Sequence, residues 1–366
     1  MDFELSDDQV ALRDAARELL HDHASPARVR SVVDAGTGFD GELWAAMREQ
    51  GWTGVATPEA DGGIGLTWVE AAILAEQVGA HVAPAPIVQH LTALASLDDA
   101  AVVAGDELAT AAWSGAREVV AFLPRAGVVV AVVGDELHIV PGGGAPEPAM
   151  DVTREVGWFE PVTGTAIGGV DAVRHHIDVG AMLLAAELLG AAQHMLDESV
   201  AYAKDRVQFG KPIGSFQAVK HRLADMLVDV EGMRSAAYWA AWCLAAEHPD
   251  ASVAASTAKS WCSDAATRVL GSALQVHGGI GFTWEHDTHL YLKRGQFDAM
   301  AFGDATWHRT RLAGLLRVRV EAGGPVLWGS RGWVGVAHSR SNRLVRSCRL
   351  CRRAAWATAS PIRSAS

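Results

Sequence analysis

The chain has 366 residues, of which 49% are hydrophobic and 20% are charged. This composition excludes intrinsic disorder over most of the chain, because there is enough apolar material for a sizeable core. No uncharged apolar run reaches the ~18 residues that a membrane-spanning helix needs, and the acidic start does not resemble a secretory signal. Four cysteines cannot form a disulfide framework, so the expected location is the cytoplasm.

The net charge of −12 is unevenly distributed. Residues 322–366 contain eight Arg and no Lys, Asp or Glu, whereas the preceding part holds 23 basic and 43 acidic residues. An acidic body is a poor candidate for nucleic-acid binding, so we expect neither nucleic acid nor a membrane as a partner. The basic tail, residues 321–366, is predicted to be disordered; a basic arm for an acidic surface and an altered reading frame are the alternatives.

The first hundred residues show the pattern of short helices. Ser6 and Gln9 form a capping box before an apolar-periodic run over residues 10–20. Pro26 is typical of the first turn of a second helix. Helical spacing returns over residues 42–50 and 68–78. We therefore predict an N-terminal helical domain over residues 1–112.

The period changes near residue 119. Short β-branched runs cover residues 119–123, 128–133 and 137–140, and Gly134-Asp135 between the last two is typical of a hairpin turn. These runs predict a short β middle domain over residues 113–175.

Long helical segments follow. They are predicted over residues 179–205, 216–247, 251–276, 288–301 and 306–318. Long helices with short connections favour a bundle, so residues 176–320 are predicted to form a C-terminal bundle of the four-helix type. The predicted fold class is α+β and mainly α.

Two glycine-containing stretches join helix ends: RVQFGKPIGSFQ at residues 206–217 and QVHGGIGFT at residues 275–283. Arg206 can complement the negative end of its helix or contact a phosphate group. Gly278 and Gly279 can simply end a helix or let the backbone approach a ligand. Taken singly, these residues leave both interpretations open.

Together the two stretches resemble the motifs of the acyl-CoA dehydrogenases, and the resemblance covers residues 1–320. It implies α,β-dehydrogenation of an acyl-CoA thioester, with a carboxylate as base, FAD as the redox cofactor and an electron-transfer flavoprotein as acceptor. Family members bind FAD at a subunit interface. The cofactor-contact residues implied here are Arg206, Phe209, Gln217, Gln275, Gly278 and Gly279.

The sequence departs from this family at the catalytic base. One familiar position for the glutamate is matched by Gly303, with Asp304 beside it, and the other falls near Gly180. The Thr-Glu-Pro-x-x-Gly-Ser-Asp stretch that holds the flavin ring is not found. Both gaps resemble one chain of the actinobacterial heteromeric (α2β2) enzymes, several of which act on steroid side-chain CoA thioesters. The leading hypothesis is one such chain, paired with a second, unlike chain.

Two alternatives remain. One is a homotetrameric dehydrogenase of fatty-acid or steroid catabolism that uses Asp304 as base, and the other is a structural paralogue without chemistry. No metal site is expected, because His286 and His289 fit no zinc pattern and Cys348-x-x-Cys351 is a lone pair.

Overall fold

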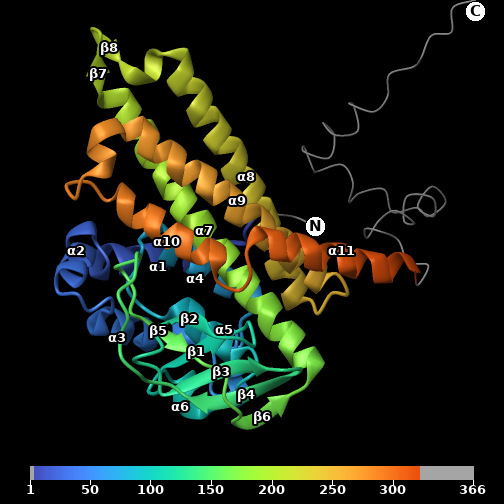
Figure 1. Cartoon of the computed structure of the whole chain (residues 1–366). Coiled ribbons are helices and arrows are strands. Elements are labelled where there is room, and N and C mark those ends of the chain that lie inside the picture. The colour runs from blue at the N-terminus through green and yellow to red at the C-terminus, as the bar shows by residue number, and fades with distance from the viewer. Residues whose placement is uncertain (1–3, 322–366) are drawn as a thin grey trace, which may run out of the picture.

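The structure, a computed structural model, describes residues 4–321. Helices pack around one long central helix, and a small β unit lies against its N-terminal half (Figure 1). The predicted disordered tail and Cys348-x-x-Cys351 lie outside the described residues. The predicted fold class, α+β and mainly α, is confirmed.

Six helices form the N-terminal part: α1 (Asp7–His23), α2 (Pro26–Asp34), α3 (Gly41–Glu49), α4 (Trp68–Ala80), α5 (Ile87–Leu94) and α6 (Ala100–Val103). The predicted capping box is confirmed, because Ser6 Oγ accepts the Gln9 N–H at 3.2 Å and the Gln9 side chain accepts the Ser6 N–H at 3.0 Å. The helices α5 and α6 were not predicted individually.

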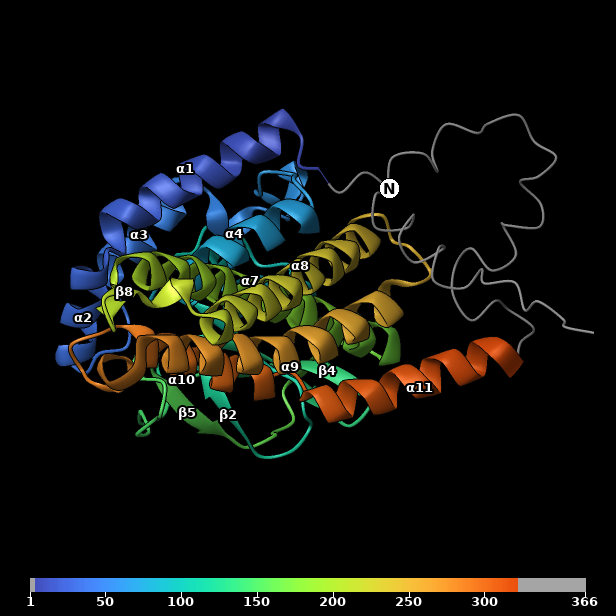
Figure 2. The same ribbon diagram turned by 90° about the horizontal axis from the view of Figure 1, so that it is seen from above.

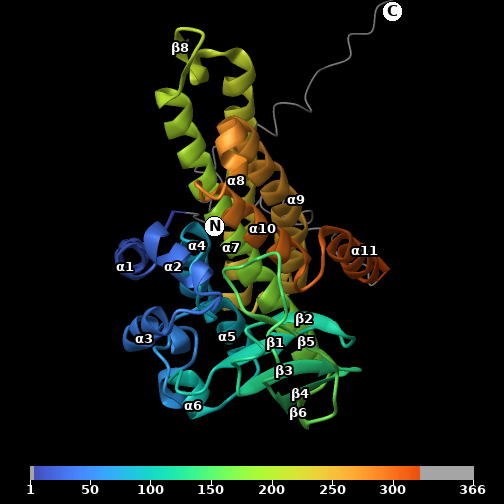
Figure 3. The ribbon, with the colours of Figure 1, turned by 60° about the vertical axis from the view of Figure 1, so that its left-hand side comes forward.

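The β unit contains β1 (Ala109–Ala112), β2 (Glu118–Ala121), β3 (Val128–Val133), β4 (Glu136–Pro141), β5 (Val156–Phe159) and β6 (Thr165–Gly168). One sheet has the order β1-β3-β4-β6, with β1 and β3 parallel and the other pairs antiparallel, and β2 pairs with β5 (Figure 3). The predicted turn between β3 and β4 is confirmed by the positive φ (63°) of Gly134.

Five helices form the C-terminal part: α7 (Val170–Asp205), α8 (Gln217–Ala245), α9 (Ala251–His277), α10 (Thr288–Met300) and α11 (Ala305–Glu321). A two-stranded hairpin, β7 (Val207–Gln208) and β8 (Lys211–Pro212), joins α7 to α8, and the 3-10 turn Gly278–Phe282 follows α9. The helix α7 packs against α4, α8 and α9 (Figure 2).

Two predicted borders differ from the observed elements. The strand β1 lies within the range assigned to the N-terminal helices, and α7 begins at Val170, nine residues before the predicted helix start. The division of the chain into domains stays a prediction, but its β unit spans 109–168 in the structure.

The helix α7 is long and apolar enough to cross a membrane by length and composition. However, 89% of its most apolar window is buried inside the protein. It is therefore the core helix of the fold, which agrees with its contacts with α4, α8 and α9.

Buried charges join the three parts of the chain. Arg294, fully buried in α10, donates to Asp151 at 3.0 Å and to Glu187 of α7 at 2.9 Å. Arg154, from the loop before β5, pairs with Glu187 and with Asp298 of α10. Because charges buried this deeply must be paired, the cluster fixes the β unit on the bundle.

Candidate functional site

The first motif forms the tip of the bundle. Arg206 ends α7 and is exposed, and the β7–β8 hairpin follows. Phe209 at the turn is 91% exposed and has a φ of +53°. A positive φ at a non-glycine residue costs about 1–3 kcal/mol. The hairpin therefore keeps Phe209 in an unfavourable backbone conformation and also leaves its apolar ring exposed to solvent. Gln217 begins α8 and is also exposed.

The second motif ends α9. Gln275 is exposed in the last turn, and Gly278 terminates the helix with a φ of +63°. A Cβ built on Gly278 or on Gly279 would meet nothing within 4 Å. The backbone of this turn is therefore open to a ligand or a partner surface, which is the second of the two interpretations that the sequence allowed.

The structure brings the two motifs to the same end of the bundle (Figures 1 and 3). Tyr202, in the last turn of α7, stacks on His277, the last residue of α9, with ring centroids 4.6 Å apart. The six predicted cofactor-contact residues thus belong to two neighbouring exposed segments. Their contact with a cofactor stays a prediction.

Gly180 and Gly303, the two positions matched to the family's base, have surroundings that differ from those of the two motifs. Phe302 is 5% exposed, and a Cβ at Gly180 would clash with its ring. Gly303 follows it with a φ of +90°, and a Cβ there would clash with the Trp307 ring. Asp304 accepts the Trp307 N–H at 2.7 Å and so caps α11. The structure therefore gives Asp304 a capping role, and its assignment as a base stays a prediction.

Aromatic side chains fill the surrounding space. Trp113 stacks on Phe302 at 6.2 Å and meets Trp307 at 5.1 Å, and His176 packs against Phe302 at 5.5 Å. Burial lowers the pKa of His176 to about 4, so it is neutral and donates to Ala112 O. The cavity that remains has a volume of about 30 Å³. Small-molecule sites measure about 300–1,000 Å³, so neither a flavin ring nor an acyl chain fits.

Lys259 of α9 fixes the turn that carries Phe302. Its fully buried Nζ donates to Gly303 O and Ala299 O, both at 3.0 Å, and to Ser263 Oγ at 3.1 Å. Burial lowers its pKa to about 7. Neither Lys259 nor Trp113 was predicted as part of this site; a lone lysine in the alanine-rich segment 251–276 was the available signal.

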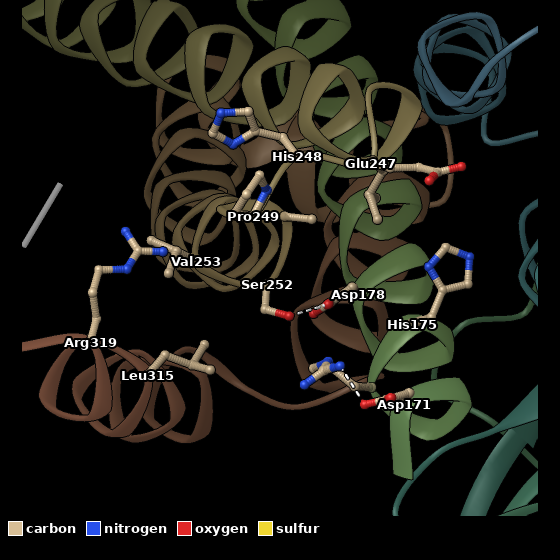
Figure 4. Close-up of a pocket in the computed structure, with 13 residues that line it drawn as sticks. Asp171, His175, Asp178, Glu247, His248, Pro249, Ser252, Val253, Leu315 and Arg319 are labelled. Carbon is tan, nitrogen blue, oxygen red and sulfur yellow. Dashed lines mark hydrogen bonds and ion pairs between the residues drawn. The ribbon is translucent and has the colours of Figure 1, made fainter. Parts of the chain in front are cut away.

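A larger cavity, of about 450 Å³, lies near the other end of α7 (Figure 4). Two of its three carboxylates are already partnered: Asp178 accepts from Ser252 at 2.5 Å and from Arg311 at 2.6 Å, and Asp171 pairs with Arg174. At 1.5 Å per helical residue, Asp178 lies about 42 Å along α7 from Arg206. This cavity is therefore separate from the two motifs.

A helical N-terminal part, a small β unit and a C-terminal bundle with two exposed turns define the acyl-CoA dehydrogenase class of flavin-dependent oxidoreductases. Two family models match the chain: "Acyl-CoA dehydrogenase, N-terminal domain" over residues 6–107 and "Acyl-CoA dehydrogenase, C-terminal domain" over residues 168–315. The chain is 36% identical over 309 residues to acyl-CoA dehydrogenase IpdE2 of Mycolicibacterium smegmatis, covering 82% of this chain and 96% of that protein. It belongs to the acyl-CoA dehydrogenase family.

Solved structures agree. A chain of the Tcur3481-Tcur3483 steroid ACAD matches with a TM-score of 0.78 and 29% identity, over 86% of this chain and 99% of that one. A chain of the ChsE4-ChsE5 complex from Mycobacterium tuberculosis matches with a TM-score of 0.78 and 25% identity, over 87% and 99%. These matches confirm the predicted family, and FAD is the cofactor of that family.

Proposed function

We propose that this chain is one subunit of a heteromeric, FAD-dependent acyl-CoA dehydrogenase, in which a second, unlike chain supplies the base and the flavin-ring site. The observation that carries the proposal is the closed interior: the Phe302 ring fills the space at Gly180, and the Trp307 ring fills the space at Gly303. These are the two positions where the family places its base. A chain whose own site is filled can take part in this chemistry only through the surface that it offers to another chain.

The residues present fit one part of FAD. The open backbone of Gly278 and Gly279 allows close approach, and Arg206 has the planar donor geometry that suits phosphate. Phe209, Gln217 and Gln275 complete the exposed set. A bound flavin supplies the acceptor for the hydride that leaves the β-carbon of the substrate. This chain's residues bind and orient the cofactor from one side, and no proton transfer is assigned to them.

Two similarities support a bulky acyl group and an unlike partner. A matching structure is described as a steroid ACAD, and another is described as a complex of ChsE4 with ChsE5. We infer that the substrate is a steroid-derived or similarly bulky acyl-CoA, that the assembly is α2β2 and that an electron-transfer flavoprotein accepts the electrons.

The test is co-expression with an unlike acyl-CoA dehydrogenase chain, followed by a count of flavin per chain. We expect a stable complex in which flavin is retained only when both chains are present. The substitution Arg206→Ala should lower the flavin content, whereas Arg317→Ala, at an exposed arginine of α11, should leave it unchanged. A pure chain that holds stoichiometric FAD and oxidises acyl-CoA alone would contradict the proposal.

Asp304→Asn separates this proposal from a homotetramer that uses Asp304 as base. Asparagine caps helices as well as aspartate does, so the fold should be retained. We expect unchanged turnover in the complex, since Asp304 caps α11 and does not line the 30 Å³ cavity. Loss of turnover with flavin still bound would favour the homotetramer. A complex that never shows a flavin spectrum would favour the structural paralogue.

A further inference from the structure

Three rings in contact connect the two cofactor-contact segments. Tyr202 lies one helical turn before Arg206, whose N–H donates to Tyr202 O at 2.9 Å. His277 directly precedes Gly278, and its ring stacks on that of Tyr202 at 4.6 Å with an interplanar angle of 29°. The ring of His286 lies 4.5 Å from that of His277 and is tilted by 51°. Each segment is thus joined to the other through one aromatic contact.

The ring of His277 is fixed in place but incompletely bonded. It is 3% exposed, and Nδ1–H donates to Ala273 O at 2.8 Å. This buried Nε2 has no hydrogen-bond partner within residues 4–321. His286 is held by Thr288, whose N–H and hydroxyl lie 3.2 Å and 2.6 Å from His286 Nδ1.

We propose that Tyr202 and His277, backed by His286, are positioning residues that hold the Arg206 segment and the Gly278 segment in the relative placement that one bound dinucleotide requires. This inference rests on the proposed function. The His277 ring does not reach a cofactor itself, because it is only 3% exposed. Tyr202 and His277 both act through the exposed segments that follow them.

The first experiment uses the full chain alone and measures hydrogen exchange. His277→Ala and Tyr202→Ala should each increase amide exchange in both segments, residues 206–212 and 278–284, because the contact that joins them is lost. His277→Phe keeps a stacking ring and should leave both segments as protected as in the wild type. An increase confined to the mutated segment would overturn the inference.

The second experiment uses the complex with the unlike chain and measures flavin release. His277→Ala should release flavin about two- to tenfold faster, the range expected for loss of one aromatic pair. His277→Phe keeps an aromatic ring beside Tyr202 and should release flavin at the wild-type rate. The control is His21→Ala, at an exposed position of α1.

The outcomes separate the two proposals. Unchanged flavin release in His277→Ala, with the complex intact, would overturn the positioning role. A wild-type chain that never takes up flavin with an unlike partner would overturn the proposed function, whereas the exchange measurement decides the coupling of the two segments without any flavin.

Discussion

Phe302 combines a backbone that favours glycine with the side chain of a core residue. Its φ is +54°, yet its ring is 5% exposed and contacts Trp113, His176 and Gly180. The strain of this conformation is offset by burial of the ring and by the two hydrogen bonds that Lys259 donates to Ala299 O and Gly303 O on either side of it. The closed interior is thus a packed part of the fold.

Phe302→Ala should therefore destabilise the chain without opening a working site. Truncation of a buried phenylalanine costs about 3–5 kcal/mol, and urea unfolding of the full chain measures it. Phe282→Ala is the matched control, because Phe282 is 68% exposed and exposed positions usually change stability by less than about 0.5 kcal/mol. Equal effects of the two substitutions would mean that Phe302 is not part of the core.

The sequence located the two exposed motifs because their glycines, proline and arginine are local signals. It also placed Gly180 and Gly303 at the two base positions. It could not show that the Phe302 ring lies against Gly180, because that contact depends on how the α10–α11 turn packs on α7. The filled site is a tertiary feature, and only a structure reveals it.

Among the elements, those with a clear period were predicted and those without one were not. The strands β3 and β4 are β-branched and flank a glycine turn. In contrast, β1 reads Ala-Thr-Ala-Ala, and its four residues are all buried, so neither propensity nor alternation marks it. The helix α5 has only eight residues, fewer than the window of about 11–18 residues in which a helical period is recognised. The first turns of α7 contain Arg174, His175 and His176, which hide the apolar pattern.

The crossing of α4 and α7 depends on two glycines. A Cβ on Gly190 of α7 would clash with Glu76 O of α4, and a Cβ on Gly79 would clash with Glu187 O. Backbone atoms cannot move aside as flexible side chains do. The two helices therefore approach as closely as their backbones allow, and this contact supports the central position of α7.

Gly190→Ala should lower the melting temperature, because overpacking costs about 1–3 kcal/mol or more. Gly314→Ala in α11 is the control: it has nothing within 4 Å of its Cβ position, and alanine stabilises a helix by about 0.5–1 kcal/mol relative to glycine. In a thermal melt, we expect Gly190→Ala to lower the melting temperature and Gly314→Ala to raise it. A Gly190→Ala protein as stable as the wild type would show that α4 and α7 are less closely packed.

At the scale of the whole molecule, the three parts are joined by polar groups that are far apart in sequence. Arg294 also donates to Val82 O and Ala83 O, at 3.4 Å and 3.3 Å, and so reaches the N-terminal part as well as Asp151 and Glu187. Sequence patterns identify charged residues but not their partners across such separations. These buried pairs could therefore not be predicted, although they decide how the parts sit together.

Buried neutral histidines join the same parts and make stability depend on pH. His90 of α5 donates to Val102 O of α6 at 2.9 Å and accepts the Ala109 N–H of β1 at 3.2 Å, so a second proton would displace the β1 contact. Burial lowers the pKa of His90 and His176 to about 4 and that of His308 to about 3. The unfolded chain, with a histidine pKa of about 6.5, therefore binds protons first on acidification.

The contribution of these histidines to the free energy of unfolding should consequently be fully present above about pH 6.5 and be lost as the pH decreases toward 4. Urea midpoints measured on the full chain from pH 8 to pH 4 check this, and each such histidine should cost a few kcal/mol. Carboxylates such as Asp40 affect stability at lower pH than the histidines do. Burial alone would raise the pKa of Asp40, but its hydrogen bonds to Arg28 and to backbone N–H groups outweigh burial and lower the pKa below the usual 3.8. Stability that stayed constant down to pH 4 and failed only below it would assign acid unfolding to the carboxylates instead.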